Sequence, residues 1–111
     1  MIDIISLLFL VWIHFISDFI LQSDKVAKKK SKEFNWLAYH SFVYALPFLL
    51  VGPSYSLING LLHFFVDGVT SRINSELYSK GKIHWFFVGI GFDQAIHITM
   101  LVLTFILIYG K

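Results

Sequence analysis

Cysteine is absent from this chain of 111 residues. Its absence excludes disulfide bonds and thiolate metal sites, so any metal site has to use histidine nitrogen and carboxylate oxygen. Charged residues are also scarce: they make up 14% of the chain, against roughly 25% in soluble domains. Hydrophobic residues make up 57%, and the mean hydropathy is +0.71. This composition predicts an integral membrane protein.

The few basic residues are unevenly placed. Five lysines lie within residues 25–32, and Arg72, Lys80 and Lys82 flank a second polar segment, whereas Lys111 stands apart. In membrane proteins, basic residues concentrate in cytoplasmic loops. We therefore interpret both segments as cytoplasmic loops in contact with membrane lipids. Because the chain is so hydrophobic, we expect no binding to nucleic acid.

The apolar runs predict four helices, at about residues 2–21, 35–51, 55–80 and 83–109. Each is close to or longer than the roughly twenty residues that cross a bilayer. The sequence therefore predicts an all-α fold, an integral membrane four-helix bundle in which residues 1–111 form a single four-span transmembrane domain. With both basic loops in the cytoplasm, both termini lie on the non-cytoplasmic side.

Histidine and aspartate recur four residues apart inside these runs. The pairs are His14 with Asp18, His63 with Asp67, and Asp93 with His97. Residues at this spacing share one face of a helix. Ionisable side chains at membrane depth face a bundle interior or a water-filled cavity. We therefore expect the three pairs to meet, together with His40, at one site that opens to the cytoplasm.

Three neighbouring carboxylates in a low dielectric repel one another, so their charge needs compensation. The sequence leaves three solutions open: a divalent cation held by carboxylates and neutral imidazoles, His⁺–Asp⁻ pairs with a protonated carboxyl group, or a water-filled passage for ions or protons. The metal hypothesis is our leading interpretation. Zinc is the expected ion, manganese and iron are alternatives, and two ions sharing a bridging carboxylate also fit the residues.

Under the metal hypothesis, the protein is a metal-dependent hydrolase that acts on a lipid or headgroup substrate from the cytoplasmic side. One zinc ion takes three or four protein ligands, fewer than the seven candidates, so a spare group remains to accept a proton from water. The expected ligands are His14, His63, Asp67, Asp93 and His97. Asp18 and His40 are assigned as ligand or catalytic base.

Two other functions fit the same residues. An ion, proton or metal transporter would use the cluster as a relay, and because four helices are few for a lone transporter, it would form a homodimer or a larger assembly. A structural or accessory membrane subunit would use the polar core only to fix helix register. Each makes a different demand on the cluster, so the sequence alone does not choose between them.

Three further residues were considered for the site. Gln94 either lines its edge or bonds a neighbouring helix, and Tyr44 either donates a hydrogen bond to His40 or a substrate or packs in the core. His84, next to Trp85, is interpreted as an interfacial residue outside the site.

These motifs resemble the membrane family known as domain of unknown function 3307. The matching features are His14-xxx-Asp18-Phe-xx-Gln22, the segment Ala27 to Lys30, Leu37-xx-His40 with Tyr44, His63-xxx-Asp67, and Asp93-Gln94-xx-His97. The resemblance covers nearly the whole chain. It implies a bacterial or phage-encoded multi-pass protein of the cell inner membrane, with the seven His and Asp residues as signature positions, and it implies no particular reaction.

Overall fold

The computed structural model describes residues 2–110, which are helical and contain no strand. The helices are α1 (Ile4–Phe15), the π-helix η1 (Ile16–Ile20), α2 (Asp24–Lys29), α3 (Phe34–Ala45), the 3-10 helix η2 (Leu46–Leu50), α4 (Pro53–Ser79) and α5 (Ile83–Tyr109). The predicted all-α class is therefore confirmed over this range. Met1 and Lys111, which belong to the predicted domain 1–111, lie outside the described residues.

Local chemistry explains where several helices begin and end. The Asp3 carboxylate accepts a hydrogen bond from the backbone N–H of Ser6 at 2.7 Å and caps α1. The same bond lowers the pKa of Asp3. Pro53 opens α4, where its missing N–H is not needed. Gly81, with φ of 72°, turns the chain from α4 into α5.

Two of the helices change pitch near their ends. After Phe15 the first helix widens into the π-helix η1, in which the N–H of Leu21 donates to the carbonyl of Ile16. After Ala45 the second helix tightens into η2, which contains Pro47, a residue that cannot donate an α-helical hydrogen bond. Single π turns inside helices occur frequently at functional sites, and η1 carries Asp18.

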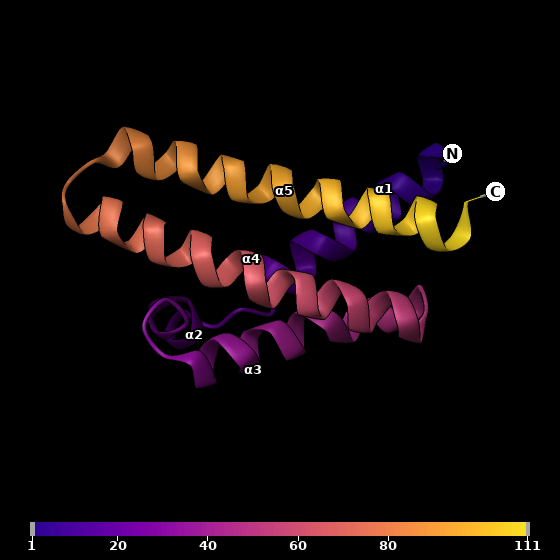
Figure 1. Ribbon diagram of the computed structural model, residues 1–111, viewed down its shortest axis with the longest axis horizontal. Helices are drawn as coiled ribbons and strands as arrows, with labels where there is room; N and C mark the ends of the chain where they lie inside the picture. The colour runs from indigo at the N-terminus through magenta and orange to yellow at the C-terminus, as the bar shows by residue number, and fades with distance from the viewer. Residues whose placement is uncertain (1, 111) are drawn as a thin grey trace.

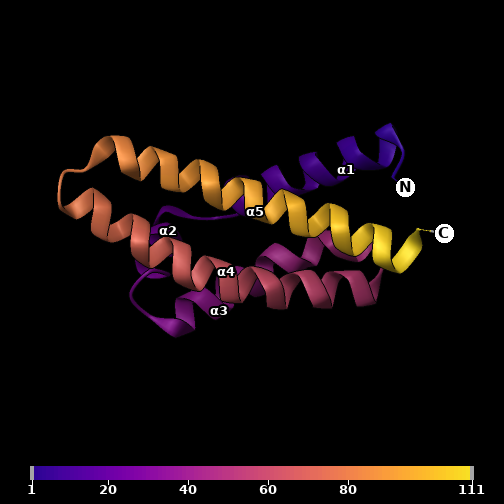
Figure 2. The ribbon, with the colours of Figure 1, turned by 45° about the horizontal axis from the view of Figure 1, so that its top comes forward.

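Helices α4 and α5 form a long antiparallel hairpin, with α3 beside α4 and α1 beside α5 (Figures 1 and 2). The lysine-bearing helix α2 lies at the end where α4 turns into α5, and the N- and C-terminal ends lie together at the opposite end (Figure 1). Both basic segments are thus at one end of the molecule, as a topology with two basic loops on one side of a membrane requires.

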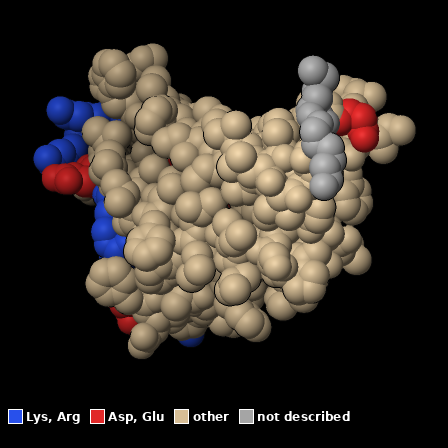
Figure 3. Space-filling view, turned by 45° about the vertical axis from the view of Figure 1, so that its right-hand side comes forward, with Lys and Arg blue, Asp and Glu red and all other residues tan. Residues whose placement is uncertain are grey.

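Burial is inverted relative to a soluble protein. The buried polar residues are His14, Ser17, Asp18, His40, Ser41, Ser56, Asn59, His63, Asp67, Thr70, Asp93 and His97. They outnumber the buried hydrophobic residues, which are Leu10, Ile13, Val26, Leu37, Tyr44, Phe48, Tyr55 and Leu101. Large apolar side chains instead lie on the surface of every long helix. Figure 3 shows a broad face without charge, with charged side chains near its edges.

By length and composition, α5 is the one helix in residues 2–110 that qualifies as a membrane span, and the apolar stretch Ile4–Ile20 is shorter. The other two predicted spans, α3 and α4, do not qualify for reasons of length and polarity. Helix α3 ends after 12 residues, and α4 has many polar residues within its 27. The coarse all-helical prediction stands, and four membrane crossings remain a proposal.

A close approach of α3 and α4 at Gly60 gives a testable prediction. A Cβ atom on Gly60 would lie 2.9 Å from Cβ of Ala45, closer than carbon atoms pack. Leucine at this position forces the helices apart, and we expect Gly60→Leu to lower the free energy of unfolding by about 1–3 kcal/mol. Thermal denaturation of the detergent-solubilised protein measures the change.

Gly91 supplies the matched control for that variant. A Cβ atom there would meet no other atom within 4 Å, so Gly91→Leu keeps the native melting temperature. Equal destabilisation by both substitutions would contradict close packing of α3 on α4.

Candidate metal centre

The seven predicted site residues are all buried and lie in one polar cluster between the four long helical segments. Helix α1 and η1 supply His14 and Asp18, α3 supplies His40, α4 supplies His63 and Asp67, and α5 supplies Asp93 and His97. The structure therefore brings together the side chains that the sequence placed on separate helices. It also divides them into two groups with different partners.

The first group is a closed ring of two carboxylates and two imidazoles. Asp18 Oδ1 lies 3.0 Å from His40 Nε2 and 3.7 Å from His63 Nε2. On the opposite side, Asp67 Oδ2 lies 3.5 Å from His40 Nε2 and 3.6 Å from His63 Nε2. Acid and imidazole thus alternate around the ring, and each donor atom faces two donors of the other kind.

Four of the six edges that a tetrahedron of these donors would have are close in length to those of a metal site. Zinc binds histidine nitrogen and carboxylate oxygen at about 2.0–2.2 Å, which places neighbouring donor atoms about 3.3–3.6 Å apart in a tetrahedron. The four distances in the ring run from 3.0 to 3.7 Å. Asp67 Oδ2 also pairs with Lys30 Nζ at 3.0 Å, and the donors that all lie within 4.8 Å of one another are those of Asp18, His40 and His63. The residues present therefore fit a divalent ion.

The second group shares Asp18 with the first. Donor atoms of His14, Asp18 and His97 also lie within 4.8 Å of one another. Asp18 Oδ2 faces His14 Nε2 at 3.8 Å, whereas its Oδ1 belongs to the ring. His97 Nδ1 lies 3.4 Å from Asp93 Oδ2. Asp18 thus presents a different oxygen to each group.

His14 is held by two hydrogen bonds. Its Nδ1 lies 2.9 Å from the hydroxyl of Tyr44, and its Nε2 lies 2.6 Å from Gln94 Oε1. The Gln94 amide nitrogen donates to Asp93 at 3.1 Å, which fixes the amide orientation and makes Oε1 an acceptor. A neutral His14 therefore carries its proton on Nε2 and accepts the Tyr44 hydroxyl proton at Nδ1. Both nitrogens of His14 are thus hydrogen-bonded, whereas neither nitrogen of the ring residue His63 is.

This arrangement answers the two questions that the sequence left open. Gln94 both lines the site and bonds a neighbouring helix, because it links His14 on α1 to Asp93 on α5. The Tyr44 hydroxyl bonds His14, not His40, and its ring stacks on His63 with centroids 3.8 Å apart. Thr70 donates a further hydrogen bond to Asp93.

Two imidazoles are buried without hydrogen-bond partners among the described residues. Neither ring nitrogen of His63 or of His97 has one. The two rings stack on each other with centroids 4.4 Å apart. A buried polar group left without a partner costs roughly 1–3 kcal/mol. Such groups point to a ligand that completes their coordination, and a metal ion does so for imidazole nitrogen.

Lys30 is a site residue that sequence reasoning missed. Its Nζ lies 3.0 Å from Asp67 Oδ2, and its side chain is only 14% exposed. The lysine run indicated topology, and no helical periodicity connected it to the pairs. With neutral imidazoles, the three buried aspartates and this one ammonium group leave two negative charges uncompensated. A divalent cation would balance this charge.

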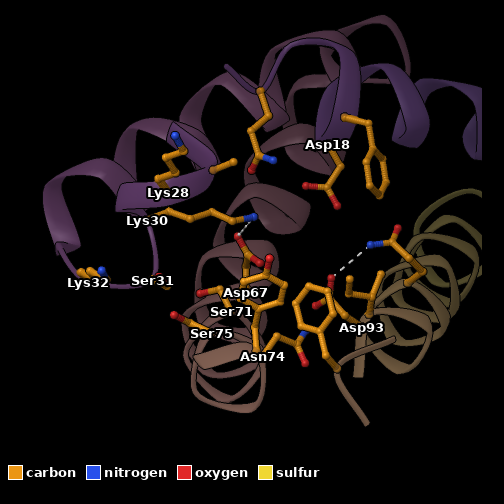
Figure 4. A pocket seen from close by; sticks show the side chains of 17 residues that line it. Asp18, Lys28, Lys30, Ser31, Lys32, Asp67, Ser71, Asn74, Ser75 and Asp93 are labelled. Atoms are coloured by element: carbon orange, nitrogen blue, oxygen red, sulfur yellow. Dashed lines mark hydrogen bonds and ion pairs between the residues drawn. The ribbon is translucent and has the colours of Figure 1, made fainter. Parts of the chain in front are cut away.

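A pocket of about 540 Å³ leads from the cluster to the lysine-bearing end of the molecule. Asp18, Asp67 and Asp93 line its inner part and project toward a common space, and Lys28 and Lys32 lie near its outer part (Figure 4). The ring is therefore accessible from the side of the basic segments. Toward the termini, the buried hydrophobic residues form a cluster of Leu10, Ile13, Tyr44, Phe48, Tyr55 and Leu101, with the buried polar residues Ser56 and Asn59 near it.

These features define an all-helical protein with an apolar exterior and a buried cluster of histidine and aspartate. The chain belongs to the family described as protein of unknown function (DUF3307), whose family model matches residues 5–110. The resemblance drawn from the sequence motifs is thereby confirmed. No match to the chain was found among curated proteins or among solved structures.

Proposed function

We propose that this protein is an integral-membrane metalloprotein with four membrane-spanning segments, whose buried site binds a divalent metal ion and opens to the cytoplasm. The observation that carries the proposal is the ring of Asp18, His40, Asp67 and His63, with donor separations of 3.0–3.7 Å. Zinc is the expected ion, with manganese and iron as alternatives.

The ligand assignment differs in part from the one based on sequence. Asp18 and His40, which the sequence left open between ligand and base, become ligands together with His63 and Asp67. His14 leaves the ligand set because both of its nitrogens are hydrogen-bonded. Asp93 and His97 form a separate pair beside the ring.

Inverted burial supports the membrane location. A soluble fold would lose stability by exposing Leu107, Ile5 and Leu50, each 78% exposed or more, while burying twelve polar residues. In a bilayer both features are favourable, because lipid covers the apolar surface and polar groups satisfy one another inside. The basic segments gather at one end, so that end is assigned to the cytoplasm of a bacterial inner membrane, with both termini on the other side.

The chemistry proposed for the site is hydrolysis of a lipid or headgroup substrate. A bound divalent ion supplies Lewis acidity, which makes water reactive near neutral pH. The Asp93 carboxylate lies 3.4 Å from His97 Nδ1, near enough for its negative charge to stabilise a protonated His97. His97 stacks on the ring residue His63 and has a nitrogen without a partner. It is therefore the group we assign to accept the proton of water.

Metal analysis of the purified protein tests the proposal. Purification in detergent without chelator, followed by mass-spectrometric metal analysis, is expected to find close to one equivalent of zinc, because a preformed site of four donors retains its ion. A content below about a tenth of an equivalent for every transition metal would sink the metalloprotein and favour a cluster held by protons and Lys30.

The transporter alternative receives less support. A relay needs a polar route through the molecule. Toward the termini, the polar side chains of Ser56, Asn59 and Thr104 bond backbone carbonyls or one another, and none of these hydrogen bonds reaches the His/Asp cluster. The homodimer expected for a transporter and the accessory-subunit alternative both remain predictions.

A further inference from the structure

The pocket beside the metal centre divides the lysine-rich segment into two sets. Lys28 and Lys32 line the pocket. Lys25 and Lys29 instead cover the ring of Trp36, with their ammonium groups 5.0 and 5.6 Å from its centroid. Lys28 and Lys32 thus border one cavity at its outer part, which a segment that served only as a topology signal would not require (Figure 4). The pocket therefore combines positive charge at its mouth with the cluster at its base.

Polar atoms without partners line the same pocket. Among the described residues, the buried atoms Ser71 Oγ and Gln22 Oε1 have no hydrogen-bond partner, and of the two only the Ser71 hydroxyl can donate to a phosphate oxygen. Ser75 follows Ser71 by one helical turn on α4 and also lines the pocket. Hydroxyl groups beside lysine side chains form the donor set that binds a phosphate group.

One wall of the pocket is apolar. Phe19, Phe86 and Ile90 contribute to its lining, and Phe19 is 45% exposed on the surface that we assign to lipid. Inorganic phosphate gains nothing from such a wall. An amphiphile does, because its phosphate meets the lysines and hydroxyls while its apolar part remains against aromatic side chains and lipid.

We infer that this pocket binds the phosphate-bearing headgroup of a membrane lipid. The inference rests on the proposed function, because it names the substrate class that the metal centre would act on. The uncompensated negative charge of the three aspartates would repel a phosphate group. A bound metal ion is therefore expected to strengthen headgroup binding, whereas Lys28 and Lys32 are expected to be needed with or without it.

The test measures binding of a short lipid that the site does not turn over. The probe is the phosphonate analogue of dihexanoylphosphatidic acid, in which a methylene group replaces the oxygen that joins glycerol to phosphorus. Titration calorimetry is carried out with detergent-purified, zinc-supplied protein. The double variant Lys28→Gln/Lys32→Gln is expected to bind the probe at least about tenfold more weakly, since hydrogen bonds to charged groups contribute that much or more.

The double variant Lys25→Gln/Lys29→Gln is the matched control. It removes the same charge from the same segment but leaves the pocket intact, so the dissociation constant is expected to stay within about twofold of wild type. Equal weakening by both double variants would overturn the inference in favour of general attraction between lysines and anions. Binding of uncharged dihexanoylglycerol as tight as that of the probe would also overturn it.

Two further arms separate related explanations. Inorganic phosphate is titrated in the same way. If it binds as tightly as the phosphonate probe, the lipid assignment is overturned and the pocket is a site for free phosphate. Zinc is measured in the same samples. If the protein contains zinc but does not prefer the phosphonate to dihexanoylglycerol, the headgroup inference alone is overturned. If the protein contains no zinc but still binds the phosphonate selectively and through Lys28 and Lys32, the headgroup site is supported and the metal centre is overturned.

Discussion

Asparagine in place of Asp18 is expected to empty the metal centre, lowering its zinc affinity by more than about 100-fold, since even residues that only orient ligands contribute 10–100-fold. Asp18 Oδ1 faces both ring histidines, at 3.0 and 3.7 Å. Asparagine keeps the shape of the side chain but removes its negative charge. Metal analysis and competition with a chromogenic zinc chelator measure the loss.

Asp24→Asn is the matched control, because Asp24 is an exposed carboxylate in α2 and lies outside the cluster. It is expected to retain the full zinc content. His63→Gln paired with His84→Gln gives the same comparison for imidazoles, since His84 is exposed beside Trp85. Full zinc occupancy in Asp18→Asn, with an unchanged helical circular dichroism spectrum, would show that the ring of four donors does not hold the ion.

Arginine in place of Phe65 is expected to abolish stable membrane insertion. Phe65 lies near the middle of α4 and is 67% exposed. On a soluble protein this change would be nearly neutral, but a charge at the centre of a membrane helix costs about 2.5–3.5 kcal/mol. The fraction of protein that resists alkaline extraction from membranes should therefore fall by more than about tenfold.

Ile83→Arg tests whether depth causes that loss. Ile83 is exposed at the first residue of α5, at the end of the molecule that carries the basic segments, so its charge reaches water. This variant should be extracted no more readily than wild type. If Phe65→Arg stays in the membrane fraction as well as Ile83→Arg does, lipid does not cover the middle of α4, and the four-span topology is wrong.

The sequence was informative wherever a property repeats along a helix. The four-residue spacing of His63 and Asp67 placed both on one face, and both lie in the ring. The limits of α5 follow from an apolar run that ends in a polar segment on one side, and Ile83–Tyr109 is the range found. These features depend on local geometry, which a single sequence contains.

Contacts between distant segments were out of reach for the same reason. Lys30 approaches Asp67 only because α2 folds against the pocket. The hydrogen bonds of His14 with Tyr44 and Gln94, which come from two other helices, were likewise not predictable from spacing. The π turn that carries Asp18 has no periodic signature, so the division of its two oxygens between two groups was also not predictable.

The order of the ring residues along the chain has a consequence for synthesis on the ribosome. Asp18 and His40 emerge first and lie 3.0 Å apart, so in the proposed topology the N-terminal half would bring its carboxylate into the bilayer with an imidazole beside it. The later half would do the same with His63 and Asp67, one helical turn apart. Under the proposed topology neither acid would enter the bilayer alone, and under the proposed metal centre the ion would bind last, because neither half of the new chain holds all four donors.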